Sequence, residues 1–338
     1  MLKTLTKTLM AAGAALALTV SAQAAETKLR IQTHYAPETP SGKLLTEYVE
    51  NIQKMSSGEI QVEMFYSSSV VKSVETFDAA ATGILDCDAT GGAYQTGKNP
   101  AFQFVGDIMG GYATPVQQLS WLYYGGGMEA AQKLYNKYDM QLVGWIVYGQ
   151  ESFASTKKIA GLSDLKDWKF RSPPGMETKI FASLGAKPIV MDFTEIFTAL
   201  ESGIIDGADA SGLANNVGLG LYDIAKNANF PGFHSMPSDH IACNKAVWDA
   251  MPDHHKTIMQ VAIGDIALKS AMTFEKKNAE AAASLKAKGV TISAWSEEDL
   301  QAFRSAAQAA WGEFATTPEA KALVESHLAY LKQLGLVQ

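Results

Sequence analysis

The sequence predicts an α/β protein with two domains and a ligand cleft between them. Strand-like and helix-like patterns alternate through residues 168–211, which is typical of a parallel sheet covered by helices. The chain of 338 residues is long enough for two domains of ordinary size. Polar breaks at residues 149–152 and 229–234 indicate that the chain crosses between the domains and returns. In such proteins, ligands gather beyond the carboxyl ends of the strands.

The first 24 residues are expected to form a secretory signal peptide that lies outside the fold. Lys3 and Lys7 precede an apolar segment at residues 9–20, and Ala22-Gln23-Ala24 is a small-x-small cleavage site. The apolar segment is too short to be a permanent membrane span. We therefore expect the mature protein to be soluble outside the cytoplasm.

The composition argues against two classes of partner and against one class of metal site. The formal net charge is −7 and the basic residues are scattered along the chain, which argues against nucleic acid and against an anionic membrane surface. The six histidines show no His-Glu-x-x-His spacing, and the two cysteines form no Cys-x-x-Cys motif. Structural zinc is therefore not expected.

Two interpretations are open for Cys87 and Cys243. An exported protein permits a disulfide, which in this chain would close a long loop. Isolated cysteines in apolar strands are also commonly small core residues. The sequence does not decide between the two.

The chain up to the first crossing predicts an alternation of strands and helices. The three glycines at residues 125–127 are a flexible junction between helices and not a phosphate loop, because no Gly-Lys-Ser/Thr follows them. The predicted strands are residues 29–33, 60–66, 86–90, 141–148 and 153–156, and the predicted helices are 43–55, 74–85, 115–124 and 128–138.

Two charged residues stand at strand ends in the central stretch. Arg171 ends the first strand of this stretch and Asp209 ends the last, so both are expected to face a ligand. Thr194 is the expected cap of the second helix. The predicted strands are residues 168–171, 187–191 and 204–209, with helices beginning at Met176 and Thr194.

The last part of the chain is mostly helical. One face of a long helix at residues 253–288 is expected to carry the buried residues. That face is predicted to hold Ile258, Val261, Ala262, Leu268 and Met272, widened by Ile263, Ile266 and Phe274. The other predicted elements are helices at 215–225, 245–251, 296–314 and 318–337 and a strand at 239–244. The final helix either packs across both domains or exchanges with a partner subunit.

The two crossings and the return define a discontinuous pair of domains. Residues 25–148 and 234–272 are expected to form domain I. Residues 149–233 and 273–338, with the C-terminal helices, are expected to form domain II.

An exported two-domain protein with a cleft is most simply a binding protein that closes on a small molecule. The alternative is an exported hydrolase, but the chain lacks Gly-x-Ser-x-Gly and Ser-x-x-Lys with Lys-Thr-Gly. We therefore expect a binding protein and not an enzyme. Arg171 is its expected centre, because a guanidinium meets a carboxylate in two parallel hydrogen bonds. The alternative is that Arg171 pairs with a surface acid.

Several motifs resemble one family of receptors. Residues 170–175 (FRSPPG), 184–188 (LGAKP) and 195–207 (EIFTALESGIIDG) resemble the solute-binding proteins of tripartite ATP-independent periplasmic (TRAP) transporters. Residues 94–102, 119–128 and 230–234 (FPGFH) are similar to the subgroup associated with 2-oxo acids, mannitol and chloroaromatic acids.

The resemblance implies a periplasmic-binding-protein-like fold with long C-terminal helices and a receptor role in the periplasm. Such a receptor delivers an organic carboxylate to a membrane permease driven by a sodium gradient. An arginine matching Arg171 grips the ligand carboxylate. In the subgroup, residues matching Gln150 and Asp209 help to hold a cation such as Na⁺ or Ca²⁺ beside the ligand, and an aromatic residue follows the acid. This sequence has Ala210 there, which leaves room for a differently shaped ligand and puts the cation in doubt.

Further expectations concern the walls of the cleft and the oligomer. Asp209 has two alternative roles, accepting a hydrogen bond from a ligand hydroxyl or pairing with Arg171. Tyr94 and Phe233 are expected to wall the cleft. His234 is expected to be either a second polar contact or a satisfied histidine in a turn. The resemblance also implies a homodimer formed by exchange of a C-terminal helix.

Overall fold

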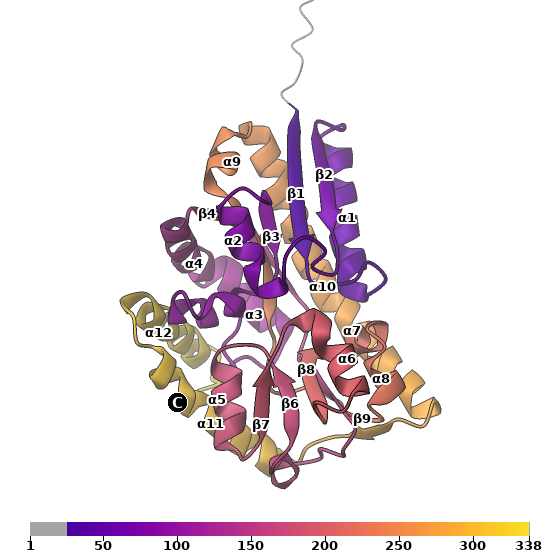
Figure 1. Ribbon diagram of the computed structural model, residues 1–338. Coiled ribbons are helices and arrows are strands. Elements are labelled where there is room, and N and C mark those ends of the chain that lie inside the picture. Colours follow the sequence, from indigo (N-terminus) through magenta and orange to yellow (C-terminus); the bar gives the residue numbers. More distant parts are fainter. Residues whose placement is uncertain (1–25, 338) are drawn as a thin grey trace, which may run out of the picture.

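The computed structural model describes residues 26–337 and arranges them around two β-sheets (Figure 1). The five-stranded sheet has the order β2-β1-β3-β10-β4, and the six-stranded sheet has the order β11-β9-β5-β8-β6-β7. The proposed signal peptide lies outside the described residues. The two sheets lie one beyond the other along the length of the molecule, as the two-domain prediction requires.

The first sheet begins with the strand–helix–strand order that the sequence predicts. Strand β1 pairs in parallel with β2 and β3, and β10 pairs antiparallel with β3 and β4. Its strands are β1 (Thr27–Thr33), β2 (Ile60–Phe65), β3 (Cys87–Ala89), β4 (Met140–Val147) and β10 (Ser238–Asn244).

The second sheet is built on the central stretch. Strand β6 pairs in parallel with β7 and β8, as predicted, while β5 pairs antiparallel with β8 and β9. Its strands are β5 (Ser152–Ser155), β6 (Lys169–Ser172), β7 (Lys187–Val190), β8 (Gly207–Ser211), β9 (Asn227–Asn229) and β11 (Thr291–Ser293).

The helices cover these sheets and follow the predicted order. They are α1 (Pro40–Met55), α2 (Thr76–Ala81), α3 (Pro115–Tyr124), α4 (Gly127–Tyr135), α5 (Met176–Ser183), α6 (Ile196–Glu201), α7 (Leu213–Gly218), α8 (Leu221–Ile224), α9 (Lys245–Ala250), α10 (Asp253–Ala287), α11 (Glu297–Phe314) and α12 (Pro318–Gln333). Two short 3₁₀ helices, Gly92–Gln95 and Pro100–Phe104, border the cleft.

Three local predictions need correction. The expected helix at residues 74–85 is α-helical only over α2. The expected helix at 215–225 is split, because Gly220 adopts a φ of 73° that ends α7 and begins α8. Thr194 does not cap the second helix: Asp192 caps the 3₁₀ turn Phe193–Glu195 that leads into α6, and its carboxylate accepts the backbone N–H of Thr194 at 3.0 Å.

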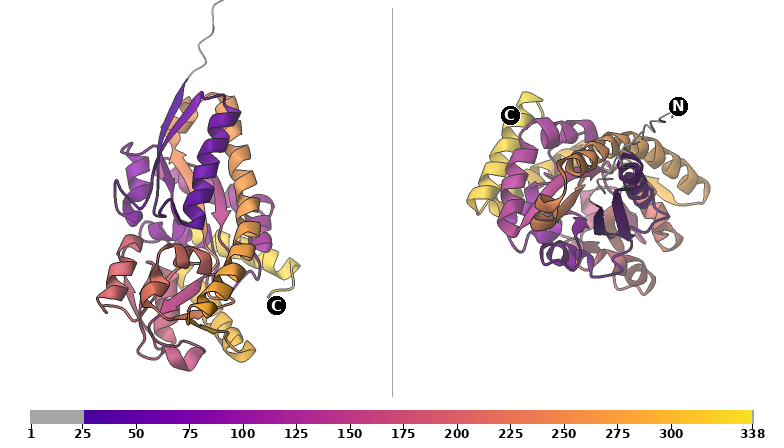
Figure 2. Two further views of the ribbon diagram at one scale, coloured as in Figure 1. Left: turned by 90° about the vertical axis from the view of Figure 1, so that its right-hand side faces the viewer. Right: turned by 90° about the horizontal axis from the view of Figure 1, so that it is seen from above.

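The predicted buried face of α10 is partly wrong. Val261, Leu268 and Met272 are exposed, with relative exposures of 58%, 54% and 61%. The buried residues include Met259, Ala262, Ile263, Ile266, Ala267, Ala271 and Phe274. The helix is long enough to run beside both sheets, and it packs on α1 and β4 in one half and on α7 and β11 in the other (Figure 2). Its buried face is therefore set by several partners that the helix pattern alone does not reveal.

The structure joins Cys87 and Cys243 in a disulfide, which decides between the two interpretations. Both residues lie on paired antiparallel strands, directly opposite each other in β3 and β10. The bridge connects two segments that are 156 residues apart in the chain. It therefore ties the returning strand β10 into the first sheet.

Helix α12 packs on its own chain, against α4 and the 3₁₀ helix at Pro100–Phe104. Leu323 and Leu331 are buried there, and the ring of His327 stacks on Trp121 with centroids 3.6 Å apart. The helix thus touches elements of the first half, whereas the sequence assigned it to domain II. The domain boundaries and the helix-exchanged homodimer stay predictions. Across residues 26–337, no helix has the length and apolar character needed to cross a membrane.

Candidate functional site

A cavity of about 70 Å³ lies between the two sheets, where the strands β1, β3, β6 and β8 end. This is the location that ligands favour in α/β proteins. The half with the first sheet lines the cavity with His34, Tyr35, Tyr94, Gln103, Asp107 and Asp239. The second sheet and the crossing before it contribute Glu151, Arg171, Glu177, Asp209 and Ala210.

Among the residues 26–337 that line this cavity, Arg171 is the one arginine, and it is only 2% exposed. Its Nη1 donates to the backbone oxygen of Asp209 at 2.8 Å, and its Nε donates to the backbone oxygen of Met191 at 3.3 Å. Its Nη2 is buried and has no hydrogen-bond partner within residues 26–337. A buried guanidinium with an unused donor is costly unless an acceptor completes it.

Three carboxyl groups and a histidine gather beside Arg171. Asp209 Oδ1 lies 2.6 Å from Nε2 of His234, and Glu151 Oε2 lies 3.8 Å from the same nitrogen. Glu177, from the first turn of α5, is also buried and lines the cavity. The ring of His234 stacks on Phe153 with centroids 4.4 Å apart, which fixes its orientation toward the acids.

Burial gives these acids different protonation states. Burial, followed by the negative charge of Asp209, raises the pKa of Glu151 and of Glu177 well above the usual range. Burial also acts on Asp209, but the opposing effects of His234, Glu177 and Arg171 leave its pKa lowered. These shifts favour the protonated, hydrogen-bond-donating form of Glu151 and Glu177 and the ionised form of Asp209.

The half with the first sheet adds a second group of polar side chains. Burial raises the pKa of Asp239 to about 8 and that of Asp107 to about 6. Asp239 accepts a hydrogen bond from the Tyr148 hydroxyl at 3.1 Å, and its Oδ2 lies 3.4 Å from His34 Nε2. Burial lowers the pKa of His34 to about 3, so this imidazole is neutral at physiological pH.

Hydrogen bonds span the cleft between the two halves. The backbone N–H of Ser73 donates to Asp192 Oδ2 at 2.8 Å, and the backbone N–H of Met176 donates to Gln103 Oε1 at 2.8 Å. The hydroxyl of Tyr35 lies 3.0 Å from that of Ser211. These contacts hold the molecule in a closed arrangement around the cavity.

The two polypeptide crossings also lie side by side. The backbone N–H of Glu151 donates to the oxygen of Ser235 at 2.8 Å. Gly232 approaches so closely that a Cβ atom there would come within 2.2 Å of the Glu151 oxygen. Close backbone contacts therefore hold the two crossings together, and this paired segment is called the hinge.

The structure brings together four of the seven residues singled out from the sequence. Tyr94, Arg171, Asp209 and Ala210 line the cavity. The other three lie next to it. Gln150 is half-buried at the hinge, Phe233 packs against Trp295 with centroids 4.3 Å apart, and His234 lies behind Asp209.

Sequence reasoning missed most of the acids. Glu151 follows directly after Gln150, and Glu177 follows the residue that opens α5, so both were near predicted positions. Asp107 and Asp239 lie in other segments and carry no local motif. Only the fold brings them to the same cavity.

Comparison with known proteins identifies one family along most of the chain. The family model for bacterial extracellular solute-binding proteins, family 7, matches residues 31–317. A monocarboxylate 2-oxoacid-binding periplasmic protein from Nostoc (all3028) is 28% identical over 297 residues, which cover 84% of this chain and 79% of the relative.

Solved structures agree with this. A TRAP periplasmic solute-binding protein from Rhodobacter sphaeroides, in an apo open form, is 31% identical with a TM-score of 0.71, covering 91% of this chain and 99% of that one. A TRAP solute-binding protein from Bordetella bronchiseptica is 24% identical with a TM-score of 0.85, covering 92% of this chain and 93% of that one. The latter is a mixed-occupancy dimer with calcium and picolinate in its bound site.

Proposed function

We propose that this chain, which belongs to the bacterial extracellular solute-binding proteins of family 7, is a periplasmic receptor of a TRAP transporter that captures a small organic carboxylate. The receptor passes its ligand to the membrane permease subunits of the transporter. The family consists of solute-binding proteins and therefore does not support the alternative that the chain is an exported hydrolase.

One observation carries the carboxylate assignment. Arg171 is buried at the cavity, and its Nη2 has no hydrogen-bond partner among the described residues. Two backbone oxygens hold the other side of the guanidinium, so its free edge is oriented before the ligand arrives. A ligand carboxylate placed there accepts a charge-assisted hydrogen bond and neutralises the buried cation.

The neighbouring acids favour a ligand that carries a second polar oxygen beside its carboxylate. Burial favours the protonated forms of Glu151 and Glu177, which can donate to a second oxygen, such as a 2-oxo or hydroxyl group. The Nostoc relative is named for monocarboxylate 2-oxo acids. Ala210 leaves space beside Asp209, so we propose a small 2-oxo or 2-hydroxy carboxylate with a substituent on that side.

The donor set also fits a hard cation. Glu151 and Asp209 offer buried carboxylate oxygens, which suit Na⁺ or Ca²⁺, and the Bordetella structure holds calcium with picolinate. We propose that these two residues, with the ligand carboxylate, would hold such an ion. Gln150, which was predicted to coordinate the cation, lies at the hinge beside Glu151. Its part in cation binding stays a prediction.

Cleft closure is part of the proposed function. The hydrogen bonds that span the cleft support a closed, ligand-competent arrangement for the chain. Opening would break the Ser73–Asp192 and Gln103–Met176 hydrogen bonds and expose the cavity.

A thermal-shift screen of organic acids with the purified mature protein tests the proposal. A ligand that binds only the folded state raises the melting temperature, and small 2-oxo acids are expected to give the largest shifts. Recovery of each hit afterwards is expected to return it unchanged. A screen in which only non-carboxylate solutes stabilise the protein would contradict the assignment.

A further inference from the structure

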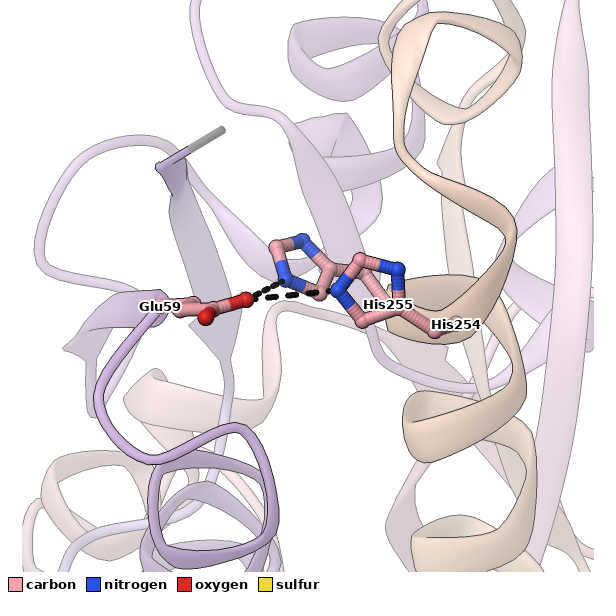
Figure 3. Close-up of side chains that lie close together, drawn as sticks. All are labelled: Glu59, His254 and His255. Carbon is pink, nitrogen blue, oxygen red and sulfur yellow. Dashed lines mark hydrogen bonds and ion pairs between the residues drawn. The ribbon is translucent and has the colours of Figure 1, made fainter. Parts of the chain in front are cut away.

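A second cluster of metal-ligating side chains lies far from the cleft. Glu59, in the turn before β2, faces His254 and His255 in the first turn of α10 (Figure 3). The cluster lies at the end of the molecule where β1 begins, opposite to the end that holds β6 and β7 (Figure 1). The proposed ligand capture does not use it.

The three side chains converge on one point. Nε2 of His254 lies 3.2 Å from Glu59 Oε2, and Nε2 of His255 lies 3.1 Å from the same oxygen. Figure 3 shows both rings turned toward this carboxylate. Zinc bonds of 2.0–2.1 Å in a tetrahedral site place neighbouring ligand atoms about 3.3 Å apart. The two measured separations are close to that value, so an ion could enter with small side-chain movements.

The surroundings of His255 match those of a metal ligand. The His255 side chain is fully buried, and its Nδ1 lies 2.8 Å from the hydroxyl of Thr27. When Nδ1–H donates to this hydroxyl, Nε2 keeps its lone pair free toward Glu59. Metal-binding histidines are commonly oriented in this way by a hydrogen bond to the second ring nitrogen.

The cluster is accessible to an ion from solvent. The side chains of Glu59 and His254 have relative exposures of 34% and 61%. Two imidazoles and one carboxylate are a donor set that suits zinc and related divalent transition metals, with water in the remaining position. Calcium and magnesium prefer sites composed of oxygen ligands.

We propose that Glu59, His254 and His255 form a binding site for a divalent transition-metal ion, with zinc as the representative. The sequence predicted no structural zinc because it contains no short ligand motif. That prediction does not cover this site, since Glu59 lies 195 residues before His254. The bound ion connects the turn before β2 with the start of α10. Through Thr27 it also connects the first strand of the fold.

The test uses the untagged mature protein, freed of metal with a chelator, and titrates it with Zn²⁺ by calorimetry at pH 7.5. Glu59→Gln and His254→Ala are each expected to weaken zinc binding by ~10-fold or more. Both positions are partly exposed, so these variants are expected to fold. Asp253→Asn is the matched control, because Asp253 is fully exposed, precedes His254 and lies outside the cluster. Its zinc affinity is expected to stay within about twofold of the wild type.

A second readout separates this site from the acidic cleft. Co²⁺ bound by two histidines and a carboxylate gives a visible absorption band, which His254→Ala is expected to lose and Asp209→Asn to keep. Zinc is also expected to raise the melting temperature of the wild type more than that of Glu59→Gln. If zinc affinity and the Co²⁺ spectrum are the same in the wild type, Glu59→Gln and His254→Ala, the cluster is an ion pair only and the proposal is overturned.

Discussion

At the scale of single residues, the cleft buries one cation, Arg171, together with five acids. These acids are Asp107, Glu151, Glu177, Asp209 and Asp239. Arg171 uses backbone oxygens on one side and keeps one donor free. The acids avoid mutual repulsion because burial keeps several of them protonated. A carboxylate ligand therefore meets a cationic donor and neutral acids, and not a uniformly negative surface.

The raised pKa of Asp239 predicts an unusual pH dependence of stability. In the folded protein this group keeps its proton up to about pH 8, whereas the unfolded chain releases it near pH 4. Stability is therefore expected to fall as the pH rises through this window, by ~1 kcal/mol per pH unit for this group. Asp239→Asn cannot lose a proton there, so its decline is expected to be shallower.

Urea unfolding of the ligand-free protein between pH 5 and 8 measures this difference. The variant Asp223→Asn, at an exposed position in the short helix α8, serves as a control for the loss of an acid elsewhere. Identical slopes for the wild type and Asp239→Asn would show that Asp239 is ionised in the folded protein.

The buried acids also predict a link between cation binding and protons. When an ion is held by Glu151 and Asp209, the proton that burial keeps on Glu151 is expected to leave. Calorimetry of calcium and 2-oxo acid binding in buffers of different ionisation enthalpy measures this release. Ligand affinity that is unaffected by chelators and by sodium removal would end the cation proposal.

At the scale of secondary-structure elements, the hinge depends on a close approach of two chain segments. Gly232→Ala would place a Cβ within 2.2 Å of the Glu151 oxygen and 2.6 Å of the Gln150 oxygen. Because both are backbone atoms, we expect the crossings to separate, with a loss of ~1–3 kcal/mol in unfolding free energy and weaker ligand binding. Gly264→Ala in α10 meets no atom within 4 Å and is expected to be neutral or stabilising.

Denaturant unfolding and ligand titration of both variants measure these effects. Equal stability and affinity for Gly232→Ala and the wild type would show that the hinge tolerates a wider separation.

Helix α12 is expected to contribute to the stability of a single chain. Leu323 and Leu331 are buried against the first half, and the Tyr112 hydroxyl lies 3.0 Å from His327 Nδ1. Deletion of residues 318–338 is therefore expected to expose the core and to lower the melting temperature strongly. Light scattering of the intact protein tests the homodimer separately. A truncated protein that melts like the intact one would contradict the packing account.

Helices and strands could be predicted where residues nearby in the sequence determine them. The order of strands and helices in residues 168–211 follows from proline, glycine and apolar spacing within the stretch, and the structure confirms this order but not the predicted start of the second helix at Thr194. The exposed positions of Val261, Leu268 and Met272 could not be predicted, because α10 packs against elements of both halves. The sequence is ambiguous wherever tertiary contacts choose the buried face.

At the scale of the whole molecule, the candidate ligand site lies between the two sheets, so its residues come from distant parts of the chain. Sequence motifs identified Arg171 and Asp209, because both were predicted to end strands in one continuous stretch; in the structure β6 continues to Ser172 and β8 to Ser211. Asp107, Asp239 and the Cys87–Cys243 disulfide depend on segments that only the folded chain brings together. The same holds for Glu59 and the two histidines at α10.

Closure of the cleft is expected to be visible in solution. The closed arrangement keeps the cleft-spanning hydrogen bonds, and ligand binding should shift the population toward it. Small-angle X-ray scattering is expected to show a smaller radius of gyration with ligand than without it. An unchanged radius on saturation would show that binding occurs without closure.

The most direct test of the central claim is ligand titration of Arg171 variants by calorimetry, using an acid identified in the thermal-shift screen. Arg171→Lys keeps the charge but loses the planar fork, and Arg171→Met loses both. We predict ~10-fold weaker binding for the first and ~100-fold or more for the second, with the folded state retained by circular dichroism. Wild-type affinity in Arg171→Met would contradict the claim that this residue anchors the ligand carboxylate.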